Sequence, residues 1–484
     1  MGALAAAKPP TIDRSAILGA VTRTIIHGGT VVNASDSAIA DVLVDGERIV
    51  AVGRNLAVDT DSDITIDATG CLVIPGGVDV HTHMQREQSS ADDHESGTLA
   101  AVWGGTTTIV DMATQNFGES LGQGLERWHA GAQASHADFG FHMIVREVTA
   151  AVLAELPALA AAGVPSFKLF MADSGGRYMV SDADLFRAMG AAAECGAMIM
   201  VHAENGGVID VLIQRALAEG RTAPINHALT RPTTAEGEAA HRAIALAELA
   251  GTPLYIVHLS SSDALAAVRE ARNRGLPVFA ETCPHYLLLD TSDLDAPDFG
   301  GAKYVCSPPL RGERDRADLW NGLRTDDLQV VSTDHCPWCF TPDKARGRDD
   351  FSLIPNGLPG VEDRLSLLWH YGVTAGHITP ERFVDLVASA PARLFGLFPR
   401  KGTISPGSDA DIVVFDPEAE RTLAAATMKS RIDYSPYEGR MVRGAPRTVL
   451  LRGRTLRDGD VLVQATATGR YLKRSSAGGT APPA

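Results

Sequence analysis

Asp79-Val80-His81-Thr82-His83 ends an apolar run and carries two histidines at positions i and i+2. Side chains alternate between the faces of a β-strand, so His81 and His83 are expected to point the same way. At the carboxyl end of a barrel strand, that face is the active-site face. Two neutral imidazoles directed at one point form half of a metal site. A lone His-x-His is equally compatible with a polar strand end that binds nothing.

Other predicted strand ends carry residues of the same kinds. His202 follows an apolar run that ends at Val201, and His258 follows one that ends at Val257. Asp334 follows Val330-Val331 in the same way. Each of these could be a buried, hydrogen-bonded polar residue. Their occurrence at successive strand ends favours a shared metal site.

Lys168 lies inside the apolar segment Pro165–Met171. A buried ammonium group is unfavourable unless it is paired or loses its charge. One interpretation is a buried salt bridge. The alternative is that burial favours the neutral amine, which adds CO2 to form a carbamate that bridges two cations.

Between residues 76 and 397, short apolar runs alternate with alanine-rich helical stretches. Predicted parallel strands lie at 107–110, 141–145, 166–171, 197–201, 254–257, 278–280 and 330–331. Predicted helices lie at 153–162, 182–196, 236–250 and 262–274. Repeated βα units over this length predict an α/β fold, a (β/α)8 TIM barrel. A doubly wound sheet is the alternative, but no glycine-rich phosphate loop accompanies it.

Both ends of the chain have the pattern of short β-strands punctuated by Gly and Asp. Residues 22–75 and 398–473 are therefore expected to build one small antiparallel β-domain together, a β-sandwich beside the barrel. The second part is also expected to hold a C-terminal oligomerisation segment. We expect a flexible N-terminal tail at 1–21 and a disordered tail at 474–484, which is rich in Ser, Gly, Ala and Pro.

Composition argues against several classes of partner. The formal net charge of the 484-residue chain is −16, whereas nucleic acid binding needs a basic stripe. No apolar run is long enough to span a bilayer, and no cationic segment precedes an apolar one as in a signal peptide. Six scattered cysteines indicate reduced thiols and a cytoplasmic location. Cys336-Pro337-Trp338-Cys339 has the spacing of a redox or zinc pair, but without a second pair we favour packed free cysteines.

Longer blocks of sequence resemble the dihydropyrimidinase/hydantoinase branch of the amidohydrolase superfamily, and the similarity extends from about residue 24 to residue 473. The blocks are Gly76–His83, Glu281–Leu287, Cys306–Arg311, Ile354–Gly357 and Gly360–Arg364. The resemblance implies a metal held by His81, His83 and Asp334. It implies a second metal held by His202 and His258, with carboxylated Lys168 as the bridge.

The implied ligand set is chemically consistent. Six ligands on two cations leave room for a hydroxide and a substrate oxygen. Two cations bring the pKa of a bound water close to neutrality and polarise the carbonyl under attack. Asp334 can accept the proton and deliver it to the leaving nitrogen. Zinc suits imidazole and oxygen ligands, and manganese or cobalt would also fit.

The resemblance further implies hydrolytic ring opening of a small cyclic amide or ureide, a dihydropyrimidine or a 5-substituted hydantoin, to an N-carbamoyl amino acid. Ser307 and Asn356 would hold the amide edge of the ring, largely through backbone groups. Both also lie in strong turn signals, Ser-Pro-Pro and Pro-Asn-Gly. A homotetramer is implied, with contacts around 433–439.

Two segments depart from the family pattern. The family carries a tyrosine five positions after the lysine, where this chain has Asp173. An ionised aspartate would repel a developing oxyanion, and Tyr178 on the same loop is the candidate replacement. The segment 85–90 is polar and shorter than the apolar loop expected there. We therefore expect Asp173 to be a substrate-binding residue in place of the tyrosine, and the substrate to carry a polar or cationic group.

Three alternatives stay open at this point. Allantoinases share the implied metal set, and cyclic imide hydrolases carry out related chemistry. The block Ile354-Pro355-Asn356-Gly357 favours the dihydropyrimidinase type. Non-catalytic scaffold relatives lack the metal ligands, whereas every ligand position is filled here.

Overall fold

The barrel is built from eight parallel strands. The computed structural model describes residues 23–57, 63–85, 89, 91–174, 176–464 and 466–476. The strands follow one another around the sheet in chain order: β8 (Gly77–Thr82), β9 (Thr106–Thr114), β10 (Asp138–Ile144), β11 (Ser166–Phe170), β12 (Met198–His202), β13 (Leu254–Ile256), β14 (Val278–Thr282) and β15 (Val330–Val331). A parallel bridge between Thr82 and His335 connects the first strand to the segment after the last. The predicted TIM barrel is confirmed.

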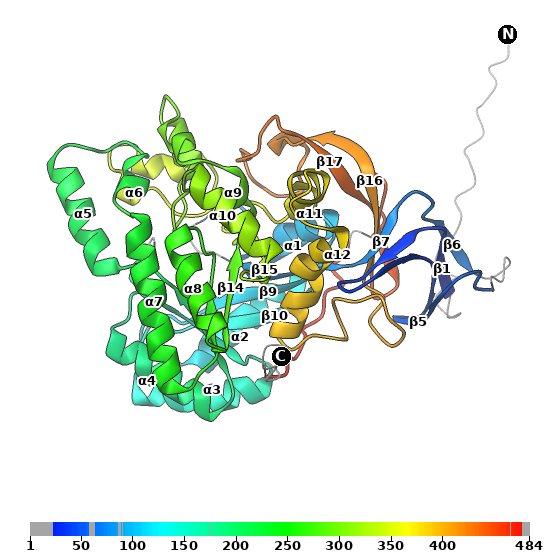
Figure 1. The fold of residues 1–484 in the computed structure, drawn as a ribbon, viewed down its shortest axis with the longest axis horizontal. Helices are drawn as coiled ribbons and strands as arrows, with labels where there is room; N and C mark the ends of the chain where they lie inside the picture. Colours follow the sequence, from blue (N-terminus) through cyan, green and yellow to red (C-terminus); the bar gives the residue numbers. More distant parts are fainter. Residues whose placement is uncertain are drawn as a thin grey trace, which may run out of the picture.

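Helices cover the outside of these strands (Figure 1). They are α1 (His94–Trp103), α2 (Leu121–Gly131), α3 (Ala150–Ala162), α4 (Asp182–Glu194), α5 (Gly206–Ala218), α6 (Asn226–Leu229), α7 (Thr233–Ala250), α8 (Ser262–Asn273), α9 (Pro284–Leu288), α10 (Glu313–Arg324), α11 (Arg364–Leu368), α12 (Pro380–Val384) and α13 (Ala390–Leu394). Side-chain caps fix several starts: Thr149, Ser181 and Ser261 accept N–H groups of α3, α4 and α8. Each cap satisfies a donor that the helix itself leaves unpaired.

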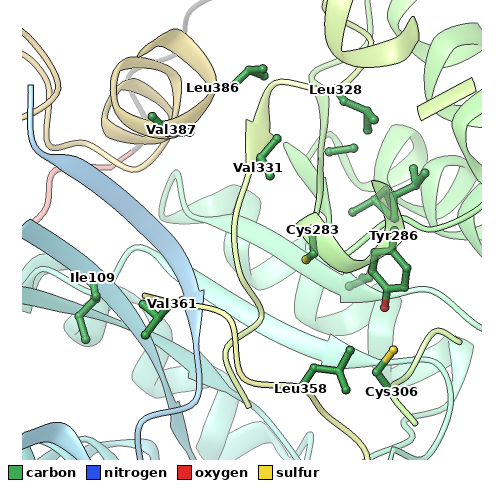
Figure 2. Close-up of a cluster of buried hydrophobic side chains, with 14 of the residues drawn as sticks. Ile109, Cys283, Tyr286, Cys306, Leu328, Val331, Leu358, Val361, Leu386 and Val387 are labelled. Atoms are coloured by element: carbon green, nitrogen blue, oxygen red, sulfur yellow. The ribbon is translucent and has the colours of Figure 1, made fainter. Parts of the chain in front are cut away.

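Apolar side chains fill both sides of the barrel strands. One cluster, with Val80, Met200 and Tyr255, lies inside the barrel. A larger one lies between the strands and the helices, and Figure 2 draws part of it around Val331 of β15. Full burial of one such side chain contributes about 1.5–3 kcal/mol. Burial on both faces explains why the barrel strands are continuous apolar runs.

The two ends of the chain build the β-domain together, as predicted. One sheet has the order β5-β4-β1-β6 and the other β19-β18-β17-β16-β7-β2-β3. The strands from the N-terminal part are β1 (Arg23–His27), β2 (Thr30–Val32), β3 (Ser37–Ile39), β4 (Asp41–Asp45), β5 (Arg48–Gly53), β6 (Ile64–Asp67) and β7 (Leu72–Pro75). Those from the C-terminal part are β16 (Ile412–Thr422), β17 (Met441–Leu451), β18 (Arg454–Asp458) and β19 (Val461–Leu462). In Figure 1 the blue β7 lies beside the orange β16.

A shared core joins these two sheets, because Val42 and Ile49 of one belong to the same apolar cluster as Ile412 and Leu450 of the other. The expectation of purely antiparallel pairing is wrong. The pairs β1·β6 and β2·β7 are parallel. The connections between these paired strands contain other strands, which lets the chain return in the same direction.

A buried ion cluster ties the β-domain to the barrel. Lys401 Nζ lies 2.7 Å from Asp138 Oδ2, 2.7 Å from Asp411 Oδ2 and 3.0 Å from Asp409 Oδ2. Burial alone would lower the pKa of Lys401, but the three carboxylates raise it above its usual value. The three aspartates could group around a metal ion, yet the ammonium group already lies among them. This cluster is therefore structural.

The prediction that a disordered tail begins at residue 474 is wrong for its first residue. Arg474, the expected first disordered residue, is buried, and its guanidinium donates to the carbonyl of Phe141 and, at 2.8 Å, to Ser166 Oγ. These carbonyl and hydroxyl acceptors on the barrel hold the guanidinium in place. The expected tail residues 1–21 and 477–484 lie outside the described residues, as do 86–88 and 90 of the polar loop. None of the described helices is both long and apolar enough to cross a membrane.

Candidate metal centre and substrate pocket

The carboxyl ends of the barrel strands bring the predicted metal ligands together. His81, Lys168 and His202 lie on β8, β11 and β12, and His83, His258 and Asp334 come just after β8, β13 and β15. Ligand atoms of His81, His258 and Asp334 all lie within 4.8 Å of one another. The backbones of His258 and Asp334 are left-handed, with φ of 40° and 45°. Residues other than glycine rarely adopt this conformation outside constrained sites such as active sites.

The donors form two groups with Lys168 beside them. Asp334 Oδ1 lies 3.2 Å from His81 Nε2 and 3.3 Å from His83 Nε2. His202 Nδ1 lies 3.0 Å from His258 Nε2. Lys168 Nζ lies 2.9 Å from His81 Nε2, so the amine contacts the first group of donors.

Buried carboxylates behind the histidines fix which ring nitrogen carries the proton. Glu281 accepts a hydrogen bond from His81 Nδ1, and Glu204 Oε2 lies 2.8 Å from His202 Nε2. Arg231 Nη1 donates to Glu204 at 2.9 Å. Although burial raises the pKa of Glu204, Arg231 and His202 lower it to about 2. The proton of each ring therefore lies on the nitrogen next to the carboxylate. The other nitrogen, His81 Nε2 or His202 Nδ1, directs its lone pair toward the other candidate ligands.

These carboxylates and Arg231 were not predicted as site residues. The only sequence signal for Glu204 is its place two positions after His202 at a strand end. Glu281 lies inside β14, and its only signal in the sequence is that it begins the family-like block Glu281–Leu287. The contacts of Glu204 and Glu281 with the histidines can be recognised only in the folded structure, where the barrel strands lie side by side.

Electrostatics favours the protonation states that bind metals. Burial lowers the pKa of His258 well below its usual value, and His202 lowers it further. Burial would raise the pKa of Asp334, but His81 and His83 hold it well below its usual value. Neutral imidazoles and an ionised carboxylate are the ligand forms that divalent cations need. The donor set therefore fits a pair of divalent metal ions.

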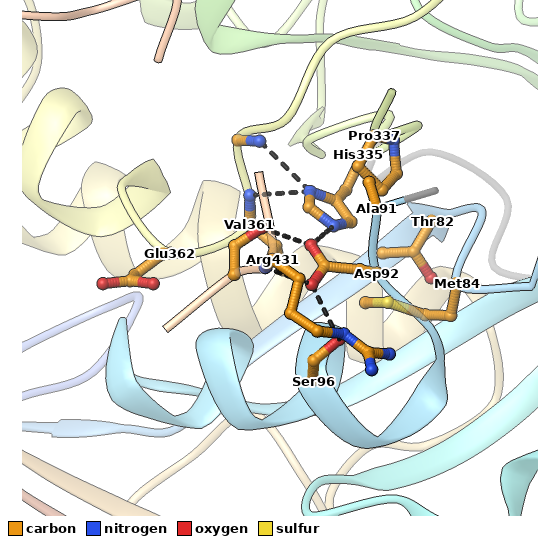
Figure 3. Close-up of polar contacts among 12 residues, drawn as sticks. Thr82, Met84, Ala91, Asp92, Ser96, His335, Pro337, Val361, Glu362 and Arg431 are labelled. Atoms are coloured by element: carbon orange, nitrogen blue, oxygen red, sulfur yellow. Dashed lines mark hydrogen bonds and ion pairs between the residues drawn. The ribbon is translucent and has the colours of Figure 1, made fainter. Parts of the chain in front are cut away.

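A polar network holds the segment that carries Asp334 (Figure 3). His335 Nε2 lies 3.2 Å from Asp92 Oδ2, and His335 Nδ1 accepts the N–H of Gly360 at 3.1 Å. Asp92 also accepts the backbone N–H of Arg431 at 2.8 Å, and the hydroxyl of Ser430 donates to it. Burial raises the pKa of Asp92, but these partners lower it to about 2. Ser430 and Arg431, from the C-terminal part of the β-domain, thus support the backbone next to Asp334.

A pocket of about 260 Å³ opens onto the candidate ligands. Its wall includes His83, Lys168, His202, His258 and Asp334, together with the predicted substrate residues Ser307 and Asn356. Apolar groups of Trp128, Ile144, Phe170 and Trp338 line the same space. A small cavity with an apolar wall and a few convergent polar groups suits a small cyclic ligand.

Ser307 and Asn356 present backbone groups to this pocket. Within the described residues, neither the N–H nor the C=O of Ser307 takes part in a hydrogen bond, and the N–H of Asn356 has no acceptor. The C=O of Asn356 accepts from Trp338 Nε1 at 3.0 Å. Unpaired backbone groups at a pocket wall are available to a ligand.

The sequence matches the Amidohydrolase family over residues 72–456. This chain belongs to the amidohydrolase family. It is 54% identical to a D-hydantoinase of Streptomyces coelicolor over 89% of this chain and 94% of that protein. It is 48% identical to a D-hydantoinase of Geobacillus stearothermophilus over 94% of this chain and 97% of that protein. The family resemblance inferred from the motif blocks is confirmed.

Solved structures of hydantoinases match this amidohydrolase over nearly its whole length. A D-hydantoinase crystal structure superposes with a TM-score of 0.92 at 47% identity, covering 94% of this chain and 100% of that one. A dihydropyrimidinase from Brevibacillus agri gives 0.91 at 47% identity, covering 94% and 99%. The L-hydantoinase of Arthrobacter aurescens gives 0.86 at 30% identity, covering 94% and 100%.

Asp173 lies elsewhere in the amidohydrolase than predicted. It is not part of the pocket wall, and its Oδ1 accepts the backbone N–H groups of Tyr178 and Met179, both at 2.7 Å. Tyr178 lines the pocket instead, with its ring 4.9 Å from that of Phe170. Asp173 is too short to reach the pocket once its carboxylate caps the loop, which corrects its assignment as a substrate-binding residue.

None of the six cysteines of the amidohydrolase forms a disulfide among the described residues, and five of the six are buried. Cys336 lines the pocket and lies near the carbonyl of Asn356. Cys339 instead lies 3.6 Å from the carbonyl of Arg431. The two thiols thus lie next to different backbone carbonyls.

Proposed function

We propose that this amidohydrolase opens the ring of a cyclic amide or ureide, a 5-substituted hydantoin or a dihydropyrimidine, to give an N-carbamoyl amino acid. The observation that carries the proposal is the convergence of five candidate ligands at the wall of one small pocket. D-hydantoinases and a dihydropyrimidinase among its relatives support the choice of substrate class.

Two divalent cations, zinc in the first place, are the proposed cofactors. His81, His83 and Asp334 would hold one cation, and His202 and His258 the other. The short contacts within each group support this division. When bound, such a pair supplies Lewis-acid polarisation of the amide carbonyl and activation of a water molecule.

Lys168 is proposed to be carboxylated and to bridge the two cations. The ammonium would lose one proton, and the neutral amine would then add CO2, forming an N–C bond and releasing a second proton, so that a buried cation becomes a buried anion. The reaction removes the desolvation penalty of the ammonium. The resulting negative charge would lie beside His81, whose Nε2 is 2.9 Å from Nζ.

The remaining roles belong to side chains and backbone of the pocket wall. The carboxylate of Asp334 would accept the proton of the attacking water and deliver it to the leaving ring nitrogen. The free backbone groups of Ser307 and the N–H of Asn356 would hold the alternating donors and acceptors of the ring. The hydroxyl of Tyr178 would donate to the carbonyl oxygen as negative charge develops there. Asp173 is then a positioning residue for Tyr178.

Two further properties are proposed with the function. We propose a homotetramer, with contacts around 433–439, and a cytoplasmic location, which the free cysteines support. Light scattering at micromolar protein should give a mass about four times the 51.1 kDa of one chain, and a monomer would contradict the assembly.

A ring-opening assay tests the function. Metal-replete protein and the Asp334→Asn variant are incubated with hydantoin, 5-methylhydantoin, dihydrouracil, allantoin and succinimide, and the products are identified by mass spectrometry. We expect N-carbamoyl products from the hydantoins or dihydrouracil, and none with the variant. Turnover of allantoin or succinimide alone would favour allantoinase or cyclic imide hydrolase. Turnover of none would favour a scaffold protein.

A further inference from the structure

An arginine lines the pocket together with the candidate metal ligands. Arg146 follows β10 directly and is half-buried in the pocket wall. Its guanidinium lies 4.2 Å from the ring centre of Phe117 and 4.5 Å from that of Tyr178. Its Nε and one Nη donate to the carbonyl of Arg177 at 3.2 and 2.9 Å. The rings and the carbonyl fix the position of this cation.

The positive charge of Arg146 is not balanced locally. No carboxylate lies within ion-pair distance of it in the described part of the chain, and its Nη1 has no acceptor there. Among the described residues of the pocket wall, Asp334 is the only acid, and it belongs to the candidate metal centre. Arg177 brings a second guanidinium, 5.2 Å from the ring of Phe117. A pocket with the guanidinium of Arg146 in its wall and that of Arg177 just outside it attracts anions.

The nearby acids on adjoining loops are engaged elsewhere. Asp173 accepts the N–H groups of Tyr178 and Met179, and Glu147 accepts the N–H of Gly118. Neither is part of the pocket wall. Neither acid is placed in the pocket wall to bind the polar or cationic group that the sequence led us to expect.

A row of aromatic rings connects Arg146 to the candidate metal centre. The ring of Tyr178 packs on Phe170 at 4.9 Å, and Phe170 stacks on His202 at 5.3 Å. A substrate ring held at the metal centre could extend a substituent along this wall. The end of that substituent would then meet the guanidinium of Arg146.

We propose that the substrate carries a carboxylate on its exocyclic group and that Arg146 binds this carboxylate. The inference rests on the proposed function and specifies its substrate as a 5-(carboxyalkyl)hydantoin. A guanidinium donates charge-assisted hydrogen bonds to a carboxylate. The same cation rejects a substituent that ends in an ammonium group.

Two isosteric substrates test the proposal. They are 5-(2-carboxyethyl)hydantoin and 5-(2-carbamoylethyl)hydantoin, which differ in charge but hardly in size. We expect the native enzyme to prefer the carboxylate in kcat/KM by about tenfold or more, chiefly through a lower KM. Raising the salt concentration should reduce the preference.

Variants assign the preference to Arg146. Arg146→Gln should bring the ratio of the two kcat/KM values close to one, and Arg146→Lys should retain part of it. Arg314→Gln is the control, because Arg314 lies on α10 with 87% of its side chain exposed and should leave the ratio unchanged. Arg146→Glu should turn the preference toward 5-(aminoalkyl)hydantoins.

The outcomes separate this proposal from a structural role and from the proposed function. If Arg146 only holds the loop through the Arg177 carbonyl, Arg146→Gln lowers both kcat/KM values in parallel and the ratio stays the same, which overturns the proposal. A native enzyme without a preference overturns it too, although turnover of 5-methylhydantoin would leave the proposed function standing. If no hydantoin is opened, both are wrong.

Discussion

The carboxylate of Asp173 and the backbone N–H of Tyr178 lie 2.7 Å apart, and this contact decides which residue of the loop reaches the pocket. The same oxygen holds the N–H of Met179. An aspartate that caps a loop in this way turns the chain locally, as in other side-chain-to-backbone turns. Tyr178 thereby lies in the pocket wall although it is ten positions after Lys168.

Tyr178→Phe removes the proposed hydrogen-bond donor and leaves the ring packing intact. We expect kcat to fall by roughly a hundred- to a thousandfold, the usual effect of losing one such donor. Asp173→Ala should lower kcat as well, because the loop loses its cap. Asp173→Tyr should also lower it, and steady-state kinetics on 5-methylhydantoin would measure all three. A gain of activity in Asp173→Tyr would show that the loop assignment is wrong.

Lys168→Ala removes the proposed bridge between the cations. We expect loss of the second metal and of nearly all turnover, with partial rescue by acetate or propionate, which replace the carbamate. Enzyme equilibrated with ¹³C-labelled CO2 should show a carbamate resonance that the variant lacks. A metal-loaded, active crystal with an unmodified Lys168 amine would contradict this account.

Lys401→Met tests the structural assignment of the second acidic cluster. Removing the ammonium takes the counter-charge from buried Asp411, whereas Asp138 keeps its ion pair with Arg452 and Asp409 keeps those with Arg48 and Arg400. Breaking a buried ion pair in this way costs about 3–5 kcal/mol of unfolding free energy. Urea unfolding should report this loss, while Lys473→Met at an exposed position should be neutral. Unchanged stability, or a metal ion bound by the native cluster, would contradict the assignment.

Asp92→Asn tests the network behind Asp334 through its pH dependence. The pKa of Asp92 is lowered from 3.8 to about 2, so its contribution to stability is present above pH 3.8 and is lost as the pH falls toward 2. That shift corresponds to roughly 2 kcal/mol. The urea midpoint of the variant should be lower than that of the native protein at pH 6, and the difference should vanish near pH 2. Asp318→Asn on α10, a partly exposed site, is the control, and a pH-independent difference would be the adverse result.

The barrel and the positions of its strand ends could be predicted from the sequence alone. Continuous apolar runs predict strands buried on both faces, and residues at the carboxyl ends of barrel strands lie at the active-site end of the barrel. His81, His202 and His258 could be found in this way because their positions depend only on local periodicity. The strands of the β-domain could be predicted from the same pattern. The parallel pairing of β1 with β6 and of β2 with β7 could not, because tertiary packing sets the pairing direction.

The parts that the sequence did not predict depend on contacts between distant or irregular segments. Glu281 is an ordinary strand residue until β14 brings it behind His81. Asp173 was assigned by counting from Lys168, and counting does not apply to a loop whose path is set by its own hydrogen bonds. Arg474 lies in a stretch whose composition indicates disorder, yet its guanidinium finds acceptors on the barrel.

The number of metal ions per chain tests the central claim most directly. Elemental analysis of the active protein, with His202→Ala and Lys168→Ala prepared in parallel, measures it without assuming a substrate. The account predicts about two divalent cations per native chain, fewer in both variants, and loss of activity on chelation that the metal restores. Active native protein with one metal ion per chain, or none, would contradict the binuclear centre.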